Sequence, residues 1–269
     1  MTGRLAVLGA GNMGGALVAG LLSAKIVKPG QITVTDVDAA RLAAIKKKWG
    51  VRTGKENRAA VQNADVIVLC VKPQQMAGVL EELAGQVGPN TLVISVAAGV
   101  RAERIEQALG KVPVVRVMPN TPALLRAGAL VFSLGRYAKP RHEDMAKKIL
   151  SALGRVWKVP ETQMDAVTAL SGSGPAYVFY LAECMAAAGV SLGLAPEMAE
   201  ALARQTVYGA GRMLAETADP AAELRRRVTS PGGTTEDALK VLAESDLAGL
   251  FNKALAAAKQ RSQTLSGGA

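Results

Sequence analysis

One segment near the N-terminus constrains the fold more than any other part of the chain. The apolar run Leu5 to Leu8 leads directly into Gly9-Ala10-Gly11-Asn12-Met13-Gly14, and an apolar helical pattern follows. A strand, a Gly-x-Gly-x-x-Gly loop and a helix in this order begin a dinucleotide-binding α/β unit. The first glycine permits the tight turn, the second lets a pyrophosphate approach the backbone, and the third lets helix and strand pack closely. The alternative is a glycine turn with a structural role only.

The chain up to residue 160 alternates short β-rich runs with helical patterns. We expect strands at Leu5–Leu8, Ile32–Thr35, Val66–Cys70, Leu92–Ser95, Val114–Met118 and Ala129–Phe132, and helices near 13–24, 38–48, 75–86 and 101–109. Continuous apolar strands separated by helices predict a parallel sheet that is covered on both faces. We therefore assign residues 1–160 to a doubly wound, Rossmann-type dinucleotide-binding domain.

From residue 161 the strand signal stops and helical patterns follow. They cover roughly 161–170, 175–191, 196–215, 219–227, 234–244 and 246–265. Strands followed by a run of helices indicate two domains, so residues 161–269 are predicted to form an all-helical domain. Its helices are rich in Ala, Leu and Met, and we expect part of their surface to be buried against a partner chain.

Scarce histidine and cysteine exclude several chemistries. The chain has one histidine and two cysteines, so it lacks the ligands for a histidine-based metal centre or a zinc module, and no metal is expected. His142 lies in a polar run, where we expect a surface residue, and Cys70 and Cys184 lie in apolar runs, where we expect buried, reduced thiols of a cytoplasmic protein. A bound cofactor is therefore expected to carry the chemistry.

Net charge and hydropathy leave two further alternatives. The net charge is +10, with basic runs at Lys46–Lys48 and Arg225–Arg227, but aromatic residues make up only 3% of the chain. Without aromatics for stacking, the pattern favours solvated helix faces and attraction of small anions over nucleic-acid binding. The apolar stretch from Ala176 to Ala195 carries Glu183 at its centre, which argues against a membrane span. The apolar N-terminus passes at once into the glycine loop and does not resemble a secretory signal.

Asp36 stands at the end of the second apolar run, about 20 residues beyond the glycine loop. An acid at this position usually accepts hydrogen bonds from the ribose of NAD and repels a 2′-phosphate. Alternatively, Asp36 or Asp38 caps the following helix. Arg41 lies one helical turn on, and Thr35 and Asn57 can donate to a phosphate. The pattern favours NADH slightly and leaves NADPH open.

Three further loops follow predicted strands. They are Val71-Lys72-Pro73, Ser95-Val96-Ala97-Ala98-Gly99 and Met118-Pro119-Asn120-Thr121-Pro122. Ligands of open α/β sheets bind beyond the carboxyl ends of the strands, so we expect these loops near a nicotinamide ring. Each loop alone is equally consistent with an ordinary turn.

A second dense motif runs from Val228 to Leu239. Its structural interpretation is a glycine turn with Thr234 as N-cap and Asp237 completing a capping box. However, Gly232 and Gly233 also expose backbone N–H groups at a helix N-terminus, and Ser230, Thr234 and Thr235 add hydroxyls. The motif therefore predicts a site for a small anionic substrate.

Together these motifs resemble the Δ1-pyrroline-5-carboxylate reductase family over nearly the whole chain. The resemblance rests on the glycine loop, the three loops above, the motif Val228 to Leu239 and Ser171-Gly172-Ser173-Gly174-Pro175-Ala176-Tyr177. It implies a Rossmann domain followed by a helical dimerisation domain. It also implies intertwined homodimers that often assemble further into decamers, with each active site between the Rossmann domain of one chain and the helical domain of its partner.

The resemblance also implies roles for particular residues. It implies reduction of 1-pyrroline-5-carboxylate to L-proline by hydride from NADPH or NADH. It places the substrate carboxylate on the turn and Thr235, the implied catalytic residue, at the ring nitrogen. The implied substrate-binding residues are Val228, Ser230, Gly232, Gly233, Thr234 and Thr235. The implied cofactor-binding residues are Gly9, Ala10, Gly11, Asn12, Met13, Gly14, Thr35, Asp36, Asn57, Val71, Lys72, Pro73, Ala97, Ala98 and Asn120.

The chain departs from the family pattern at two positions, and two rival functions remain. Asp36 stands where many members carry Ser, Asn or Arg, and Cys70 replaces a common alanine. One rival is another Rossmann imine reductase or a β-hydroxyacid-type dehydrogenase. The latter normally uses a catalytic lysine on a helix of the second domain, and no lysine occurs between Lys158 and Lys240. The other rival is a non-enzymatic dinucleotide sensor, which leaves the hydroxyl-rich turn unexplained.

Overall fold

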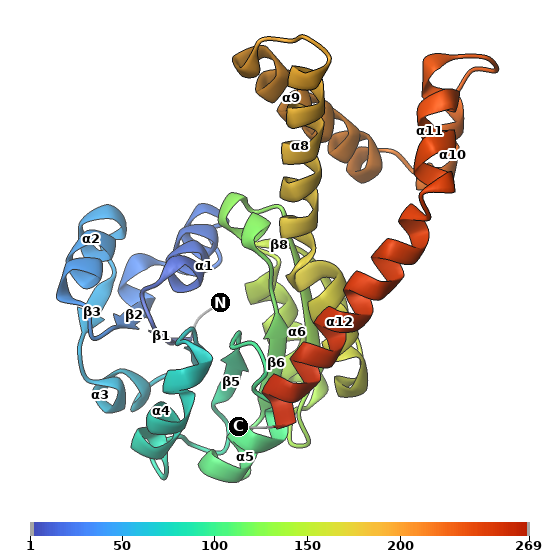
Figure 1. The fold of residues 1–269 in the computed structure, drawn as a ribbon. Helices are drawn as coiled ribbons and strands as arrows, with labels where there is room; N and C mark the ends of the chain where they lie inside the picture. Colours follow the sequence, from blue (N-terminus) through green and yellow to red (C-terminus); the bar gives the residue numbers. More distant parts are fainter. Residues whose placement is uncertain (1–2, 268–269) are drawn as a thin grey trace. The chain divides into compact units, whose positions relative to one another are not determined.

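An eight-stranded sheet is the centre of the first part of the chain in the computed structural model, which describes residues 3–267 (Figure 1). The strands are β1 (Leu5–Leu8), β2 (Ile32–Thr35), β3 (Arg52–Gly54), β4 (Val66–Leu69), β5 (Leu92–Ser95), β6 (Val114–Met118), β7 (Gly128–Leu134) and β8 (Gly154–Lys158). Their order in the sheet is β3-β2-β1-β4-β5-β6-β7-β8. Every neighbouring pair is parallel except β6 and β7, which are antiparallel.

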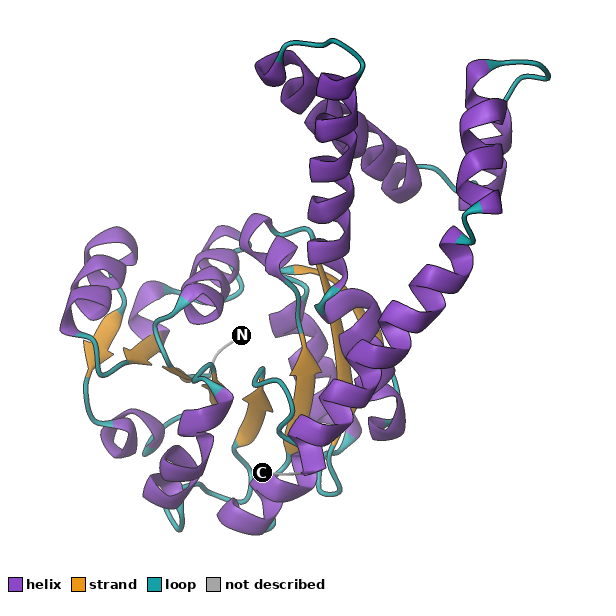
Figure 2. Ribbon diagram, viewed as in Figure 1, coloured by secondary structure: helices purple, strands orange, loops and turns teal. Residues whose placement is uncertain are grey.

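Helices cover both faces of this sheet, as the continuous apolar strands predict (Figure 2). They are α1 (Asn12–Ser23), α2 (Ala39–Trp49), α3 (Asn57–Val61), α4 (Met76–Leu83), α5 (Ala102–Leu109) and α6 (Pro140–Leu150). Side chains of β1 alternate between two hydrophobic clusters. Leu5 and Val7 pack with residues of α1, α2 and α6, whereas Ala6 and Leu8 pack with residues of α3, α4 and α5. The doubly wound α/β fold is thereby confirmed.

The sequence did not predict β3, β8, α3 or α6. β3 has only three residues, and β8 is an edge strand of mixed exposure with a half-exposed Trp157, so neither shows a continuous apolar run. The expected strand Ala129–Phe132 is the middle of the longer β7. α6 begins with the polar run that contains His142 and shows no helical pattern there, because the apolar residues that reach the core, among them Ala146, Ile149 and Leu150, come later in the helix.

The remaining elements are helical. They are the 3₁₀ turns Pro29–Gln31, Pro73–Gln75, Thr121–Leu125 and Glu161–Gln163, then α7 (Met164–Val167), the π-helical turn Thr168–Gly172, α8 (Gly174–Ser191), α9 (Pro196–Glu216), α10 (Ala221–Arg227), α11 (Thr234–Glu244) and α12 (Leu247–Gly267). This confirms the all-helical character predicted for the chain beyond residue 161.

The chain divides into two compact units, Met1–Ser173 with Ala258–Ala269, and Gly174–Ala257. This division differs from the predicted boundary at residue 160 in two ways. Residues 161–173 stay with the sheet, and Glu161 pairs there with Arg116 of β6 at 2.7 Å. The end of α12 also belongs to the first unit, where the Ser262 hydroxyl donates to Asp165 at 2.7 Å. Residues 161–173 and the end of α12 belong to the first unit because of tertiary contacts, which no local sequence pattern indicates.

The second unit has very little hydrophobic core of its own. Among its described apolar residues only Ala199, Ala203 and Leu224 are buried. Phe179 and Tyr180 of α8 are 64% and 67% exposed. Burial of so little apolar surface does not offset the entropy of ordering these helices. The second unit therefore needs another surface to cover it.

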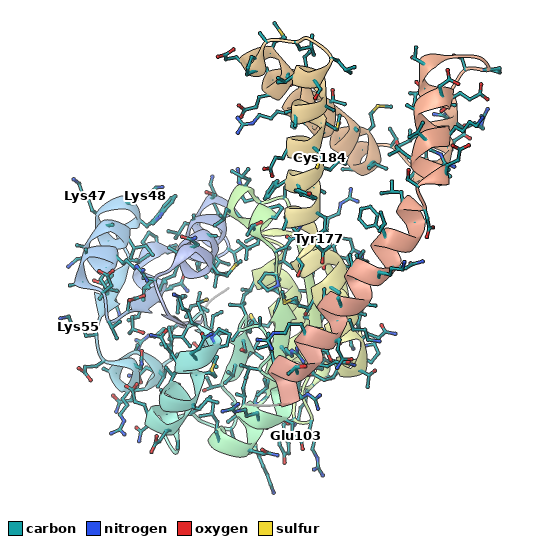
Figure 3. All side chains as sticks on the ribbon, viewed as in Figure 1. Lys47, Lys48, Lys55, Glu103, Tyr177 and Cys184 are labelled. Carbon is teal, nitrogen blue, oxygen red and sulfur yellow. The ribbon has the colours of Figure 1, made fainter. Side chains whose placement is uncertain are left out.

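Cys184 illustrates this point. It lies on α8 and is exposed, so the expectation that it is buried is wrong for the single chain (Figure 3). The apolar run around it is real, but apolar residues surround α8 instead of forming one stripe that a single neighbour could cover. Cys70 is half-buried, and both cysteines are free.

Two further features, a membrane span and a metal centre, concern the described residues as a whole. No helix among them is both long enough and apolar enough to cross a membrane. Within residues 3–267 no three His, Cys, Asp or Glu side chains are grouped so that they could hold a metal ion.

His142 is buried, which contradicts the predicted surface position. It occupies the third residue of α6, where its Nδ1 accepts a hydrogen bond from the Lys139 backbone N–H at 3.0 Å. This bond satisfies one of the donors that every helix leaves free at its N-terminus. Burial, together with the charges of Arg141 and Lys139, lowers the pKa of His142 below its ordinary value of 6.5.

This pKa shift predicts an acid-sensitive contribution to stability. The folded chain favours the neutral imidazole, so the contribution is complete above pH 6.5 and is lost as the pH falls through the lowered pKa of the folded state. In His142→Gln a side-chain oxygen can still accept from Lys139, but it does not titrate. We expect the free energy of unfolding, measured in urea from pH 7 to pH 5, to fall more in the wild type than in His142→Gln. Equal slopes would contradict this role.

Candidate functional site

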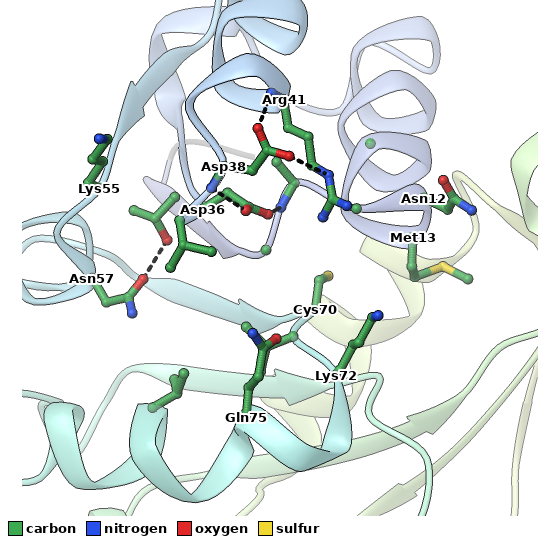
Figure 4. Close-up of a pocket in the computed structure, with 18 of the residues that line it drawn as sticks. Asn12, Met13, Asp36, Asp38, Arg41, Lys55, Asn57, Cys70, Lys72 and Gln75 are labelled. Atoms are coloured by element: carbon green, nitrogen blue, oxygen red, sulfur yellow. Dashed lines mark hydrogen bonds and ion pairs between the residues drawn. The ribbon is translucent and has the colours of Figure 1, made fainter.

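A cleft of about 1030 Å³ lies at the carboxyl ends of β1, β2 and β4 (Figure 4). The sheet order β2-β1-β4 shows that the chain leaves β1 in one direction along the sheet and returns on its other side. Ligands of open α/β sheets bind at this point of reversal. Residues from all three strand ends line the cleft. They are Gly9, Ala10, Gly11, Asn12, Met13, Gly15, Thr35, Asp36, Val37, Asp38, Arg41, Lys55, Asn57, Cys70, Val71, Lys72, Gln75, Val79 and Leu124.

The three glycines of the loop are required for different reasons. Gly9 has φ +108°, and a Cβ there would lie 2.7 Å from the carbonyl oxygen of Cys70. A Cβ on Gly14 would overlap the carbonyl oxygen of Gly9. The protein itself therefore demands glycine at both positions. A Cβ on Gly11, in contrast, would meet no protein atom within 4 Å, so the space beside Gly11 is open to a ligand.

The N-terminus of α1 is free to bind an anion. Gly11 is the N-cap residue, no side chain caps the helix, and its first turn contains no acidic residue. Backbone N–H groups at such a helix end carry partial positive charge and attract phosphate. The open position at Gly11 and the uncapped helix together fit a pyrophosphate, as the sequence predicts.

Asp36 and Asp38 have separate roles. The Asp36 carboxylate accepts hydrogen bonds from the backbone N–H of Ala10 at 2.7 Å and of Asp38 at 2.9 Å, so it ties the end of β2 to the glycine loop. Asp38 caps α2 by accepting from the N–H of Ala40 at 2.9 Å and of Arg41 at 3.2 Å. The alternative in which an acid caps α2 is thus true of Asp38.

Asn57 is oriented by two side chains. The Thr35 hydroxyl donates to Asn57 Oδ1 at 2.6 Å, and Asn57 Nδ2 donates to Glu82 at 2.7 Å. An amide nitrogen carries two hydrogens, so one N–H of Asn57 remains for a ligand in the cleft. The two predicted residues Thr35 and Asn57 therefore form one connected group.

The opposite wall is formed by the segment after β4. Val71 and Lys72 lie there, as predicted, together with Gln75 and Val79. Burial raises the pKa of the Cys70 thiol to about 12, so this thiol stays protonated and does not act as a nucleophile. Lys72 supplies a positive charge to this side of the cleft.

Ten of the predicted cofactor-binding residues line the cleft, and five do not. The five are Gly14, Pro73, Ala97, Ala98 and Asn120. The side chain of Asn120 holds the backbone instead, since Oδ1 accepts from Ala129 N–H at 2.9 Å and Nδ2 donates to the Ser171 carbonyl at 3.1 Å. Gly14 packs against the loop itself. Contacts of Pro73, Ala97 and Ala98 with a cofactor remain predictions.

Sequence reasoning missed several lining residues. Lys55 follows β3, a strand with no sequence signal, and Leu124 comes from a 3₁₀ turn far along the chain. The sequence points to Arg41 and Asp38 only as neighbours of Asp36. The regular spacing of α2 could have placed Arg41 near Asp36, but only the fold brings Lys55 and Leu124 to the cleft.

The predicted substrate turn lies between α10 and α11 in the second unit. Gly232 has φ +70°, and Gly233 is the N-cap of α11 without a side-chain hydrogen bond. The predicted capping box of Thr234 and Asp237 is therefore wrong. Glu236 accepts from the Gly232 N–H at 2.6 Å in its place, because Glu236 is the residue that stands third in the helix.

The N–H groups of Gly232 and Gly233 donate to Glu236 and to the Ser230 carbonyl, so the prediction that both are free for a substrate is wrong. The turn keeps other donors for an anion. Thr234 and Thr235 are the first two residues of α11, where helix geometry provides no backbone acceptor for their N–H groups. Ser230 lies in the same turn, and the predicted substrate-binding residue Val228 is 61% exposed. The neighbouring Arg226 and Arg227 pair with Glu223 and Asp219. This part of the basic run is therefore a solvated helix face, as the sequence favoured.

Comparisons with known proteins agree over the full chain. Residues 161–265 match the family described as pyrroline-5-carboxylate reductase dimerisation, and residues 4–99 match NADP oxidoreductase, coenzyme F420-dependent. A pyrroline-5-carboxylate reductase of Pseudomonas aeruginosa is 45% identical over 98% of this chain and 97% of its own length. The structure of a pyrroline-5-carboxylate reductase from Coxiella burnetii has a TM-score of 0.94 at 44% identity, covering 99% of both chains.

A third similar protein carries a ligand. The crystal structure of Plasmodium falciparum pyrroline carboxylate reductase with NADP bound has a TM-score of 0.85 at 28% identity and covers 98% of both chains.

The glycine loop predicts a separation of binding from stability. Gly11→Ala adds a methyl group only to the open cleft, so we expect an unchanged Tm and a Kd for dinucleotide that rises by at least about tenfold. Gly14→Ala forces a methyl group onto the Gly9 carbonyl and is expected to lower the Tm as well. Thermal melts and calorimetric titration with NADH and NADPH measure both effects. If Gly11→Ala bound the dinucleotides as tightly as the wild type, the glycine loop would not be part of the cofactor site.

Proposed function

The chain belongs to the pyrroline-5-carboxylate reductase family, and on that premise we propose how its residues perform the reaction. It is an NAD(P)H-dependent oxidoreductase that reduces 1-pyrroline-5-carboxylate to L-proline, a step of proline biosynthesis. The observation that carries this function within the chain is the cleft at Gly11 and the uncapped N-terminus of α1. Both fit a dinucleotide, in a chain similar to these reductases from end to end.

The cleft residues hold and orient the cofactor. The first turn of α1 binds the pyrophosphate, and the group of Thr35, Asp36 and Asn57 faces the adenosine ribose. The segment of Val71 and Lys72 on the opposite wall faces the nicotinamide half. When bound, the dihydronicotinamide supplies the hydride.

The turn between α10 and α11 binds the substrate. The N–H groups and hydroxyls of Ser230, Thr234 and Thr235 hold the carboxylate, and the Thr235 hydroxyl forms a hydrogen bond with the ring nitrogen. The carbon of a protonated imine accepts hydride readily, so these residues mainly position it. This accounts for an enzyme with one histidine, which is buried in a helix cap, and with a cleft thiol that stays protonated.

The chain also associates with itself, as the match to a dimerisation family indicates. We propose an intertwined homodimer, with decamers as a further assembly, in which the partner chain's turn completes each cofactor cleft. The exposed apolar side chains of α8 and α9 and a groove of about 700 Å³ between these helices support burial against a second copy. The free cysteines support a cytoplasmic location.

The proposed reaction is tested by following NADH and NADPH oxidation in parallel at 340 nm with pyrroline-5-carboxylate. We expect turnover that requires this substrate, with L-proline as product by chromatography. Two comparison substrates are tested. One is a cyclic imine without a carboxylate, with the reduced cofactor, and the other is a 3-hydroxy acid, with the oxidised cofactor. Turnover of these alone would favour the imine reductase or β-hydroxyacid dehydrogenase. Cofactor binding without any turnover would favour the sensor.

The role of Thr235 predicts a defect in the chemical step. Thr235→Ala removes one hydrogen bond to the reacting nitrogen, and we expect kcat/KM to fall roughly 10²-fold, which is about 2–3 kcal/mol. Thr235→Ser keeps the hydroxyl and is the matched control that should retain most activity. An unchanged kcat/KM in Thr235→Ala would show that the assigned role is wrong.

The same variant tests the shared active site. In a mixture of Thr235→Ala and Gly11→Ala chains, each mixed dimer has one site with both defects and one site with neither, provided that partner chains share their sites. Statistical mixing after dissociation and reassociation should then restore about a quarter of wild-type activity. If each site came from one chain, the mixture would stay as inactive as its components.

A further inference from the structure

The adenosine end of the cleft contains two acidic and two basic side chains. Asp36 and Asp38 lie at the end of β2 and the start of α2, with Arg41 and Lys55 beside them (Figure 4). NADH and NADPH differ at this end only, by a phosphate on the ribose 2′-oxygen. The charges of these four side chains therefore affect how well the cleft accepts a 2′-phosphate.

The Asp36 carboxylate is held in place. One of its oxygens accepts from the Ala10 N–H at 2.7 Å, and the other accepts from the Asp38 N–H at 2.9 Å. Rotation away from the cleft would leave both N–H groups without this acceptor, and leaving a partly buried donor unsatisfied is costly. Each carboxylate oxygen can accept a second hydrogen bond, so ribose hydroxyls are still accommodated. A 2′-phosphate is not, because its charge has the same sign.

The nearby cations do not neutralise this carboxylate. Arg41 Nε pairs with Asp38 at 3.2 Å, and Asp38 also caps the helix that carries Arg41. The charge of Arg41 is thus paired with Asp38, the N-cap residue of its own helix. Lys55 follows β3, which neighbours β2 on the side away from β1, and Figure 4 shows it apart from Asp36. A phosphate at the ribose would therefore meet a fixed negative charge first.

We propose that Asp36 selects NADH over NADPH, because the glycine loop that it braces also prevents the carboxylate from turning away from the ribose. Asp36 is thus both a positioning residue for the loop and the residue that determines cofactor specificity. This inference rests on the proposed function only in treating the cleft as the cofactor site. Dinucleotide binding tests this inference, whereas substrate turnover tests the proposed reaction.

The test measures Kd by calorimetry for NADH and NADPH and for the fragments 5′-AMP and adenosine 2′,5′-bisphosphate. The fragments differ only in the 2′-phosphate and do not reach the nicotinamide half. We expect the wild type to bind NADH, and 5′-AMP, at least about tenfold more tightly than its phosphorylated counterpart, with a preference that weakens as salt increases. A wild type that binds both members of each pair equally, or prefers the phosphorylated one, would overturn the proposal without the need for any variant.

Asp36→Asn removes the charge and keeps an oxygen for the Ala10 N–H, whereas the Asp38 N–H loses its acceptor. We expect it to shift the ratio of the two Kd values toward NADPH by at least about tenfold. Asp38→Asn is the matched control, because it removes an equal charge from the same wall and keeps the oxygen that caps α2. It should shift the ratio much less, since the Asp38 carboxylate is paired with Arg41 and caps α2.

Three results with single variants would contradict the proposal. If Asp36→Asn weakened the binding of NADH and NADPH equally, Asp36 would only hold the glycine loop in place and would not select the cofactor. Equal shifts in Asp36→Asn and Asp38→Asn would assign the preference to the overall charge of the wall. A wild-type preference for NADPH that Arg41→Gln or Lys55→Gln abolishes would show that these cations bind the 2′-phosphate, which is the opposite assignment. Circular dichroism melts establish that each variant is folded.

Discussion

The close approach of the glycine loop to the end of β4 is the constraint on which the cofactor cleft depends. Gly9 turns at positive φ directly beside the Cys70 carbonyl, and Gly14 packs on the Gly9 carbonyl, so neither position has room for a side chain. This contact places the N-terminus of α1 at the carboxyl edge of the sheet with its N–H groups free. The Asp36 carboxylate then holds the loop from the side of β2.

The two units differ in how much apolar surface each buries within a single chain. The first contains two hydrophobic clusters, one on each face of its sheet, and buries its central strands β1, β4 and β5 completely. The second has few buried residues and exposes large apolar side chains along α8 and α9. A helical unit of this kind is stabilised only when a second surface covers it, which agrees with the dimerisation family that it matches. Stability and assembly are therefore linked in the second unit.

Errors in the sequence reasoning have physical causes. His142 and α6 were misjudged because a polar first turn hides a helix whose later residues are buried. β3 and β8 were missed because edge strands need no continuous apolar run, and Cys184 was misplaced because burial on α8 requires a second surface that one chain lacks. The capping box failed by one residue, since the choice of N-cap depends on the backbone of Gly232 and Gly233. For β3, β8 and Cys184 the deciding contacts are not local, whereas His142 and the cap of α11 depend on the backbone geometry of a helix N-terminus.

The sequence alone determined the doubly wound fold, the glycine loop, the helical second half and the family, because periodicity and short motifs are local properties of the chain. It also predicted ten residues that line the cleft. Only the tertiary structure decided which contacts the side chains in and around the cleft make. It showed that Asn120 holds backbone, that Asp38 caps α2 and that Asp36 is locked to Ala10. Hydrogen bonds between residues distant in sequence exist only after the sheet has brought its strand ends together.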